Sequence, residues 1–204
     1  MTVLLIQSQY PSDGMAPSPF EGAVAEGRVR PVRELSLHKE DFEAISGLIT
    51  TMHLDQIGFR RFADAVTAFL SGGGRWIFNG HMLRPPIGGL GLYRRLESPK
   101  RGDFALSRLC RHPIFDGIDQ KTLETNHGVA GFYGRGYNPL PDEAVAINGI
   151  GPDNHPIDWV WQRPEGGAIL SHAGNEFWGC GDDAATKQRL ADRAVAWAGG
   201  ELAT

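Results

Sequence analysis

Cysteine is scarce in this chain of 204 residues, which contains only Cys110 and Cys180. The two lie far apart and lack the close C-x-x-C pairing of zinc sites, so a zinc ribbon or finger is excluded. Two cysteines are also too few for a disulfide-dense scaffold. A single disulfide between them would be chemically allowed, but no pattern in the sequence argues for it.

Concentrated positive charge is also absent. Lys and Arg together number 20 against 24 Asp and Glu, which gives a net charge of −4 and a pI near 6.0. No basic block or Arg/Lys stripe occurs, and the aromatic residues do not alternate with basic ones. Nucleic acid is therefore not an expected partner.

Long apolar runs are missing as well. The start, "MTVLLIQSQYPSDG", has no basic n-region, and its apolar run ends after four residues, Val3 to Ile6. That is too short for a signal peptide or a membrane span. We expect a soluble, cytoplasmic protein with no membrane partner.

What is present fits one globular domain over residues 1–204. Apolar residues make up 41% and charged residues 22%, and 27 glycines with 13 prolines indicate many tight loops. There is no internal repeat, low-complexity tract or long linker to divide the chain.

The first half of the chain predicts a strand–helix–strand unit. "TVLLIQS" reads as a buried parallel strand, and 55–71 carries one apolar helical stripe. Asp55 is suited to cap this helix, and Gly72 to Gly74 are suited to end it. The strand "RWIFN" follows at once, so a right-handed βαβ connection is expected.

The remaining elements are predicted from shorter patterns. "RVRPVREL" indicates an edge strand because it contains Pro31, and a further strand is centred on residues 45–50. Strands are also expected near 144–147, at "DWVWQ" and at "GAILS", the last two joined by a turn at 164–167. A final helix is expected to begin after Asp182 or Asp183 and to stop at Gly199. Strands alternating with helices favour the α/β class.

A histidine ends the stretch "GGGRWIFNGHML". His81 follows a predicted buried strand, and Asn79 and Gly80 are suited to a tight turn because both tolerate a positive φ. His172 follows the predicted strand "GAILS". Ligands of parallel α/β sheets bind at the carboxyl ends of the strands, so the two histidines are expected to face one cleft. Imidazole there suits acid–base chemistry, whereas the alternative for His81 is a turn-closing hydrogen bond.

This part of the sequence resembles the nucleophile elbow of the class I glutamine amidotransferase-like superfamily. It has the same order of a helix, a glycine stop, a strand and a turn with a functional side chain. The elbow of its enzymes reads Gly-x-Cys-x-Gly, and the matching stretch here is "NGHML", with His81 in place of the cysteine. The sequence is more similar to the ThuA-like branch, which lacks that cysteine. "HPIFDGI" (112–118) and "GGAILSHAGNEF" (166–177) also resemble stretches of that branch.

The resemblance implies a flavodoxin-like three-layer sandwich with a mostly parallel central sheet. In the amidotransferases the histidine after the late strand belongs to the triad and is closely followed by a glutamate. The corresponding pair here is His172 and Glu176, four residues apart rather than two. The resemblance therefore implies His81, His172 and Glu176 as catalytic candidates, but not glutaminase activity. It also implies a small polar ligand, with a sugar derivative as the candidate.

Several residues are candidates for binding that ligand. Arg84 follows the elbow, and its guanidinium is suited to a bidentate contact with a carboxylate or phosphate of the ligand. An ion pair that holds the loop explains an arginine at this position equally well. Trp178 is suited to a carbohydrate rim or to the core. Asn79 and Gly80 are expected to shape the turn.

A metal site formed by His81, His172 and a carboxylate such as Glu176 or Asp55 is chemically sensible, but no HxH or HExxH spacing supports it. The sequence leaves the cofactor unknown.

Three functions remain open at this stage. The first is a ThuA-like protein that binds a small molecule around His81 and His172. The second is a non-catalytic binding or assembly module, and the third is a hydrolase that uses Cys180 as nucleophile. The sequence does not decide whether the protein is an enzyme, and it leaves a homo-oligomer open.

Overall fold

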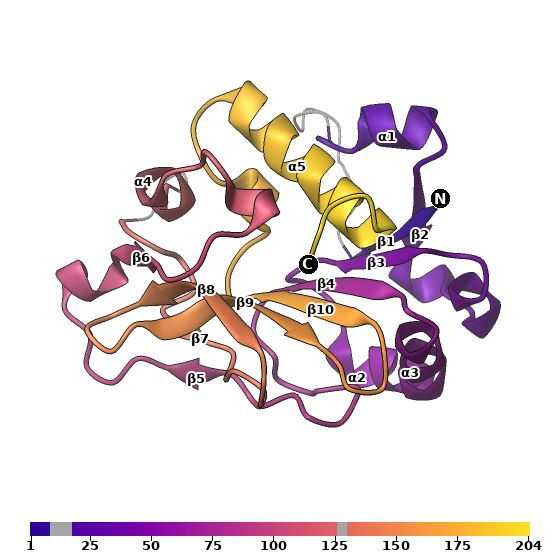
Figure 1. The fold of residues 1–204 in the computed structure, drawn as a ribbon, viewed down its shortest axis with the longest axis horizontal. Helices are drawn as coiled ribbons and strands as arrows, with labels where there is room; N and C mark the ends of the chain where they lie inside the picture. Colours follow the sequence, from indigo (N-terminus) through magenta and orange to yellow (C-terminus); the bar gives the residue numbers. More distant parts are fainter. Residues whose placement is uncertain (9–17, 126–129) are drawn as a thin grey trace.

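The computed structural model describes residues 1–8, 18–125 and 130–204. An eight-stranded sheet forms the middle layer, and helices lie on both of its faces (Figure 1). The strand order is β2-β1-β3-β4-β10-β9-β8-β6. This arrangement confirms the predicted α/β, flavodoxin-like sandwich.

Five neighbouring strands run parallel and three run antiparallel. The parallel strands, in sheet order, are β2 (Val29–Arg33), β1 (Val3–Gln7), β3 (Gly47–Thr50), β4 (Arg75–Asn79) and β10 (Ala168–His172). The antiparallel ones are β9 (His155–Gln162), β8 (Val145–Ile150) and β6 (Leu106–Arg108). A separate two-stranded sheet pairs β5 (Arg94–Arg95) with β7 (Gly136–Tyr137).

The short helices are α1 (Glu21–Ala25), α2 (Gln56–Phe59) and α4 (Gln120–Glu124), and the longer ones are α3 (Ala63–Ser71) and α5 (Ala184–Gly199). Turns of 3₁₀ helix occur at η1 (Glu34–Ser36), η2 (Lys39–Phe42), η3 (Arg60–Phe62), η4 (Arg101–Phe104), η5 (Pro113–Phe115) and η6 (Phe177–Gly179). No helix in the described ranges is long and apolar enough to cross a bilayer.

The strand β1 shows why a continuous apolar run predicts a central strand. Alternate side chains point to opposite faces of the sheet. Leu5 packs into the core under α5, whereas Leu4 and Ile6 pack into the core under α3. Both faces are covered, which accounts for the apolar run from Val3 to Ile6. The predicted edge strand with Pro31 is confirmed as β2.

The predicted helix over 55–71 is interrupted, which corrects the expectation of one continuous helix. The turn η3 separates α2 from α3. This break lets Phe59 and Phe62 both face the core beside Phe42, with Phe42–Phe62 ring centroids 5.7 Å apart. The Asp55 cap is confirmed, because its carboxylate accepts from the Ile57 amide at 3.1 Å.

The final helix agrees with its prediction. Asp183, one of the two proposed caps, accepts from the Thr186 amide at 2.7 Å, and Gly200 ends α5 in the left-handed conformation. The buried face of α5 carries the apolar stripe Leu190, Ala191, Ala194, Trp197 and Ala198. It packs over β1, β3 and β4, as the yellow helix in Figure 1 shows.

Candidate functional site

A sharp turn connects the end of β4 to His81. Gly80 adopts a φ of +112°, and its amide donates to the carbonyl of His172 at 2.9 Å. A Cβ at position 80 would lie 2.9 Å from the Met52 Cα, so the turn requires glycine. Asn79 was expected to share the positive φ, but only Gly80 has it.

Asn79 ties the strand ends together. Its side chain is buried, and its amide donates to the Thr50 carbonyl at 3.0 Å. Its carbonyl oxygen accepts from the Phe177 backbone at 3.4 Å. Because both the nitrogen and the oxygen of its side-chain amide bond within the protein, Asn79 supports the turn and does not face solvent.

A second asparagine, Asn138, supports the turn from the opposite side. Its amide donates to the Gly80 carbonyl at 3.0 Å and to the Ser171 hydroxyl oxygen at 2.9 Å. Its oxygen accepts from the Met82 amide at 2.9 Å. Sequence reasoning missed this residue because it lies in a loop far from the turn that it holds. The only available signal was its place in "GYNP", a turn-forming context.

His81 lies on the wall of an open cleft. Its ring stacks on Tyr93 at a centroid distance of 3.8 Å, and its Nε2 has no hydrogen-bond partner among the described residues. Burial lowers the His81 pKa, the nearby Arg95 lowers it further, and a backbone hydrogen bond with Gly134 opposes both. The imidazole is therefore neutral at neutral pH and able to donate or accept a hydrogen bond.

The cleft around His81 has a volume of about 570 Å³, which suits a small molecule. The residues that line it are His81, Tyr93, Arg95, Ala130, Tyr133, Gly134 and Arg135. The hydroxyl of Tyr93 donates to the Gly134 carbonyl, which fixes the ring under His81.

His172 lies at the end of the neighbouring strand β10, paired with Asn79 of β4. Its Nδ1 is 2.6 Å from Asp158 Oδ1, and the side chains are 1% and 0% exposed. Phe132 and Phe177 present their ring edges to the imidazole at centroid distances of 5.5 Å and 5.7 Å. The other ring nitrogen, Nε2, has no partner among the described residues.

Asp158 belongs to a longer chain of hydrogen bonds. Its second oxygen accepts from the Asn148 amide at 2.6 Å, and Asn148 in turn accepts from Gln120 at 3.0 Å. Gln120 accepts from the Arg108 guanidinium at 2.8 Å. The chain runs from β6 through α4, β8 and β9 to His172, so these side chains fix the orientation of the imidazole.

Glu176 does not hold His172. One of its oxygens accepts from the Met52 amide at 3.0 Å, which ties the segment after β10 to the segment after β3. The orienting carboxylate is that of Asp158. It was missed because it comes from the antiparallel neighbour β9 rather than from the residues following the histidine. The signal was a single acid at the start of the otherwise apolar "DWVW".

Arg84 and Trp178 do not line the His81 cleft. Arg84 is exposed, and its guanidinium donates to the adjacent Leu83 carbonyl at 2.8 Å. Trp178 is 6% exposed and packs edge-to-face on Phe20 at a centroid distance of 5.0 Å. The structure thus brings His81, Asn79, Gly80 and the backbone of His172 together, and it leaves these two residues elsewhere.

No disulfide joins Cys110 and Cys180. Cys110 is exposed and Cys180 is 1% exposed, directly after η6. A thiol so enclosed is not accessible to a substrate in this conformation. Across 1–8, 18–125 and 130–204, no group of three or more His, Cys, Asp or Glu side chains is arranged to hold a metal ion.

No family model matches this sequence, and no curated protein matches it. Solved structures do share its fold. A cytoplasmic protein from Salmonella typhimurium superposes with a TM-score of 0.57 at 12% identity, covering 97% of this chain and 98% of the other. The N-terminal domain of mmIFT52 superposes with a TM-score of 0.52 at 13% identity, covering 97% of each chain.

A third similar structure is a candidate GMP synthase component from Thermoplasma acidophilum. Its TM-score is 0.54 at 8% identity, and the match covers 98% of this chain and 95% of the other. At such low identities these three likenesses establish a common architecture over nearly the whole chain, and nothing narrower.

Proposed function

We propose that this chain is a glutamine amidotransferase-like protein of the ThuA-like type that binds a small polar ligand at the His81 cleft. It would have no cysteine-dependent glutaminase activity. The shared fold with the candidate GMP synthase component supports the superfamily. A carbohydrate-derived ligand follows from the ThuA-like resemblance alone.

The observation that carries this proposal is the Gly80 turn. This turn leads into His81, which lines an open cleft. In the resemblance, position 81 is that of the elbow cysteine. A cysteine–histidine mechanism needs an accessible thiolate, and Cys180 is enclosed in the core. The alternative of a Cys180 hydrolase is therefore the weaker one.

In this proposal each residue has a distinct role. His81 contacts the ligand from the cleft wall and, if the protein is catalytic, takes part in proton transfer. His172 and Asn79 are positioning residues, since the His172 carbonyl accepts from Gly80 and Asn79 joins the strand ends. Glu176 holds the β3 end through Met52 and acts on the ligand only indirectly. Arg84 and Trp178 have no part.

The non-catalytic binding module remains the second candidate, and the enclosure of the His172 ring favours it. At 1% exposure, this imidazole cannot reach a ligand in the cleft without a rearrangement. A single accessible imidazole, His81, is sufficient to bind a ligand. In the triad template, by contrast, a histidine base works together with a separate nucleophile.

Calorimetric titration of the full chain with neutral sugars, sugar acids, sugar phosphates and glutamine tests the proposal. We expect at least one sugar-derived compound to bind, and His81→Ala to weaken that binding about ten-fold or more. The matched control is His53→Ala, which removes an exposed histidine outside the cleft. Glutamine hydrolysis abolished by Cys180→Ala would overturn the proposal, as would ligand binding that His81→Ala leaves unchanged.

A further inference from the structure

We infer that the His81 cleft recognises a small ligand through an oxyanion, a carboxylate or a phosphate, which Arg95 and Arg135 hold. This inference rests on the proposed function and narrows its ligand class. The starting point is the charge of the cleft wall. Two guanidinium groups line it, and no carboxylate of the described residues does.

The positive charge of Arg135 is not offset by an acid. Its guanidinium donates to the Ala130 carbonyl at 3.0 Å and lies 3.8 Å from the centroid of the Phe104 ring. Both contacts orient the group without neutralising it. Within the part of the chain that the structure describes, neither Arg95 nor Arg135 forms an ion pair. An oxyanion would accept charge-assisted hydrogen bonds from both guanidinium groups and balance their charge.

The two arginines are held in register by a short ladder. Arg95 pairs with Gly136 across β5 and β7, and the Arg135 carbonyl accepts from the Leu96 amide at 3.1 Å. Arg135 itself has a φ of +56°, a conformation that costs a non-glycine residue free energy. Strain of this kind clusters at ligand sites, and here it places a guanidinium on the cleft wall.

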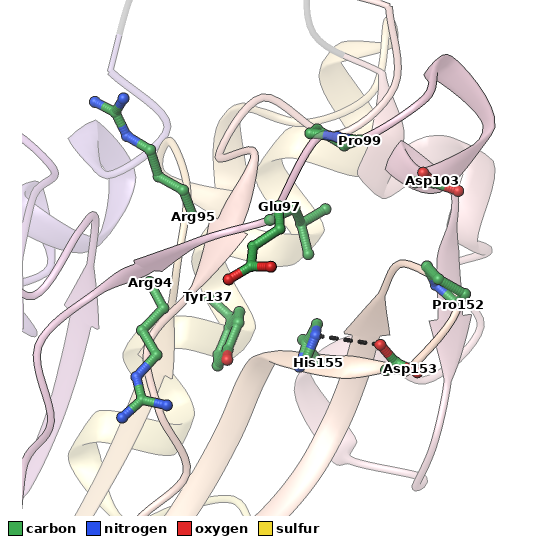
Figure 2. A pocket seen from close by; sticks show the side chains of 10 residues that line it. Arg94, Arg95, Glu97, Pro99, Asp103, Tyr137, Pro152, Asp153 and His155 are labelled. Carbon is green, nitrogen blue, oxygen red and sulfur yellow. Dashed lines mark ion pairs between the residues drawn. The ribbon is translucent and has the colours of Figure 1, made fainter.

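A neighbouring cleft provides the contrast within the same molecule. A cleft of about 540 Å³ is lined by Arg94 and Arg95 together with Glu97, Asp103 and Asp153. Figure 2 shows the Glu97 carboxylate turned toward Tyr137 and His155, and it shows Arg94 and Arg95 pointing in opposite directions. That cleft is lined by acids as well as arginines, whereas the described residues that line the His81 cleft include arginines and no acid.

The remaining wall would hold the body of the ligand. His81 and Tyr93 form a stacked pair, and Tyr133 is 41% exposed at the same cleft. Aromatic faces beside a few directed polar groups are typical of sites for small polar molecules. A neutral His81 carries no charge that would compete with the arginines for the anion.

The test compares ligands that share one sugar ring and differ in the neutral or anionic group at C6. The full chain is titrated calorimetrically with glucose, glucuronate and glucose 6-phosphate, and with acetate and inorganic phosphate alone. We expect an anionic sugar to bind with an affinity at least about ten-fold higher than that of glucose. Acetate against phosphate identifies which oxyanion is recognised. Arg95→Gln should weaken that binding about ten-fold or more, and Arg94→Gln should leave it unchanged.

Two results would overturn the inference. Glucose binding as tightly as its anionic derivatives would do so, and so would equal losses in Arg94→Gln and Arg95→Gln, which indicate a diffuse charge effect. The proposed function fails in a different way, when His81→Ala leaves all binding unchanged. If binding is lost in His81→Ala but intact in Arg95→Gln, the proposed function stands and the recognition of an anion is rejected. Circular dichroism confirms that each variant is folded.

Discussion

The Nδ1 atom of His172 and the Oδ1 atom of Asp158 lie 2.6 Å apart inside the sheet, each on a side chain that is almost completely buried. The two residues face each other across the antiparallel pair β9–β10, in direct register. A buried polar pair of this kind is costly to break, because either partner alone is left without its hydrogen bond.

Replacing Asp158 with Asn should therefore destabilise the protein. The side-chain amide of Asn cannot accept from both His172 and Asn148 as the carboxylate does. We expect the free energy of unfolding to fall by about 2–5 kcal/mol in urea denaturation. Asp153→Asn is the control, since that carboxylate is 78% exposed and its loss should change stability by no more than about 0.5 kcal/mol. Equal stability of the two variants would contradict the structural role of the pair.

The turn at Gly80 gives a sharper test of the elbow. In Gly80→Ala the new methyl group would approach the Met52 Cα to 2.9 Å at a φ of +112°. We expect a loss of at least about 1–3 kcal/mol of stability, because both backbone strain and a backbone clash must be relieved. Gly88→Ala is the matched control, since a methyl group there would meet no atom within 4 Å and its φ is not positive. A Gly80→Ala protein as stable as Gly88→Ala would show that the turn does not need glycine.

The main elements were predictable because their signals are local. The apolar run of β1 must be covered on both faces, and Asp55 and Asp183 cap the helices that follow them. The apolar stripe of α5 and the glycine after β4 can likewise be recognised from residues that are close together in the sequence. These features depend on a few neighbouring positions, so their physical reading does not require the tertiary structure.

The site was less predictable because its contacts join distant segments. Asp158 reaches His172 only through the register of an antiparallel hairpin, and Asn138 reaches Gly80 from a loop 58 residues further on. The two residues of β5 are too few to show a period, yet they place Arg95 on the cleft. The break between α2 and α3 likewise follows from packing of Phe62 rather than from propensity.

His112 should make the stability depend on pH. Its pKa is lowered to about 4, mainly by burial, with Asp158 opposing this effect and Arg108 and Arg75 adding to it. The unfolded chain therefore binds a proton near pH 6.5, where the folded protein does not. Stability from this group is complete above about pH 6.5 and is lost as the pH falls toward 4.

The measurement is the free energy of unfolding from pH 7 to 4. The loss due to His112 should reach about 3 kcal/mol at the low end, given roughly 1.4 kcal/mol per pKa unit. His112→Asn is the informative variant, because its side chain can still accept from the Ile114 amide, as His112 Nδ1 does at 3.4 Å. We expect a shallower pH dependence in this variant. An unchanged slope would assign the pH dependence to other groups.

The last prediction concerns the electrostatic link between His81 and Arg95. The Arg95 charge lowers the His81 pKa in addition to the larger effect of burial. Removing that charge in Arg95→Gln should raise the pKa of the imidazole, because the protonated form is then no longer repelled by the Arg95 guanidinium. An NMR titration of the His81 ring proton measures this shift directly and needs no ligand.

Arg94→Gln provides the matched control for this titration. The two arginines are adjacent in β5 and equally charged, but Arg94 points away from Arg95 and does not line the His81 cleft (Figure 2). Its removal should leave the His81 pKa where it was, apart from a small effect that salt screens. A rise of the same size in both variants would mean that His81 senses only the overall charge of the strand. A rise confined to Arg95→Gln would place that guanidinium beside the imidazole in solution, as the anion site requires.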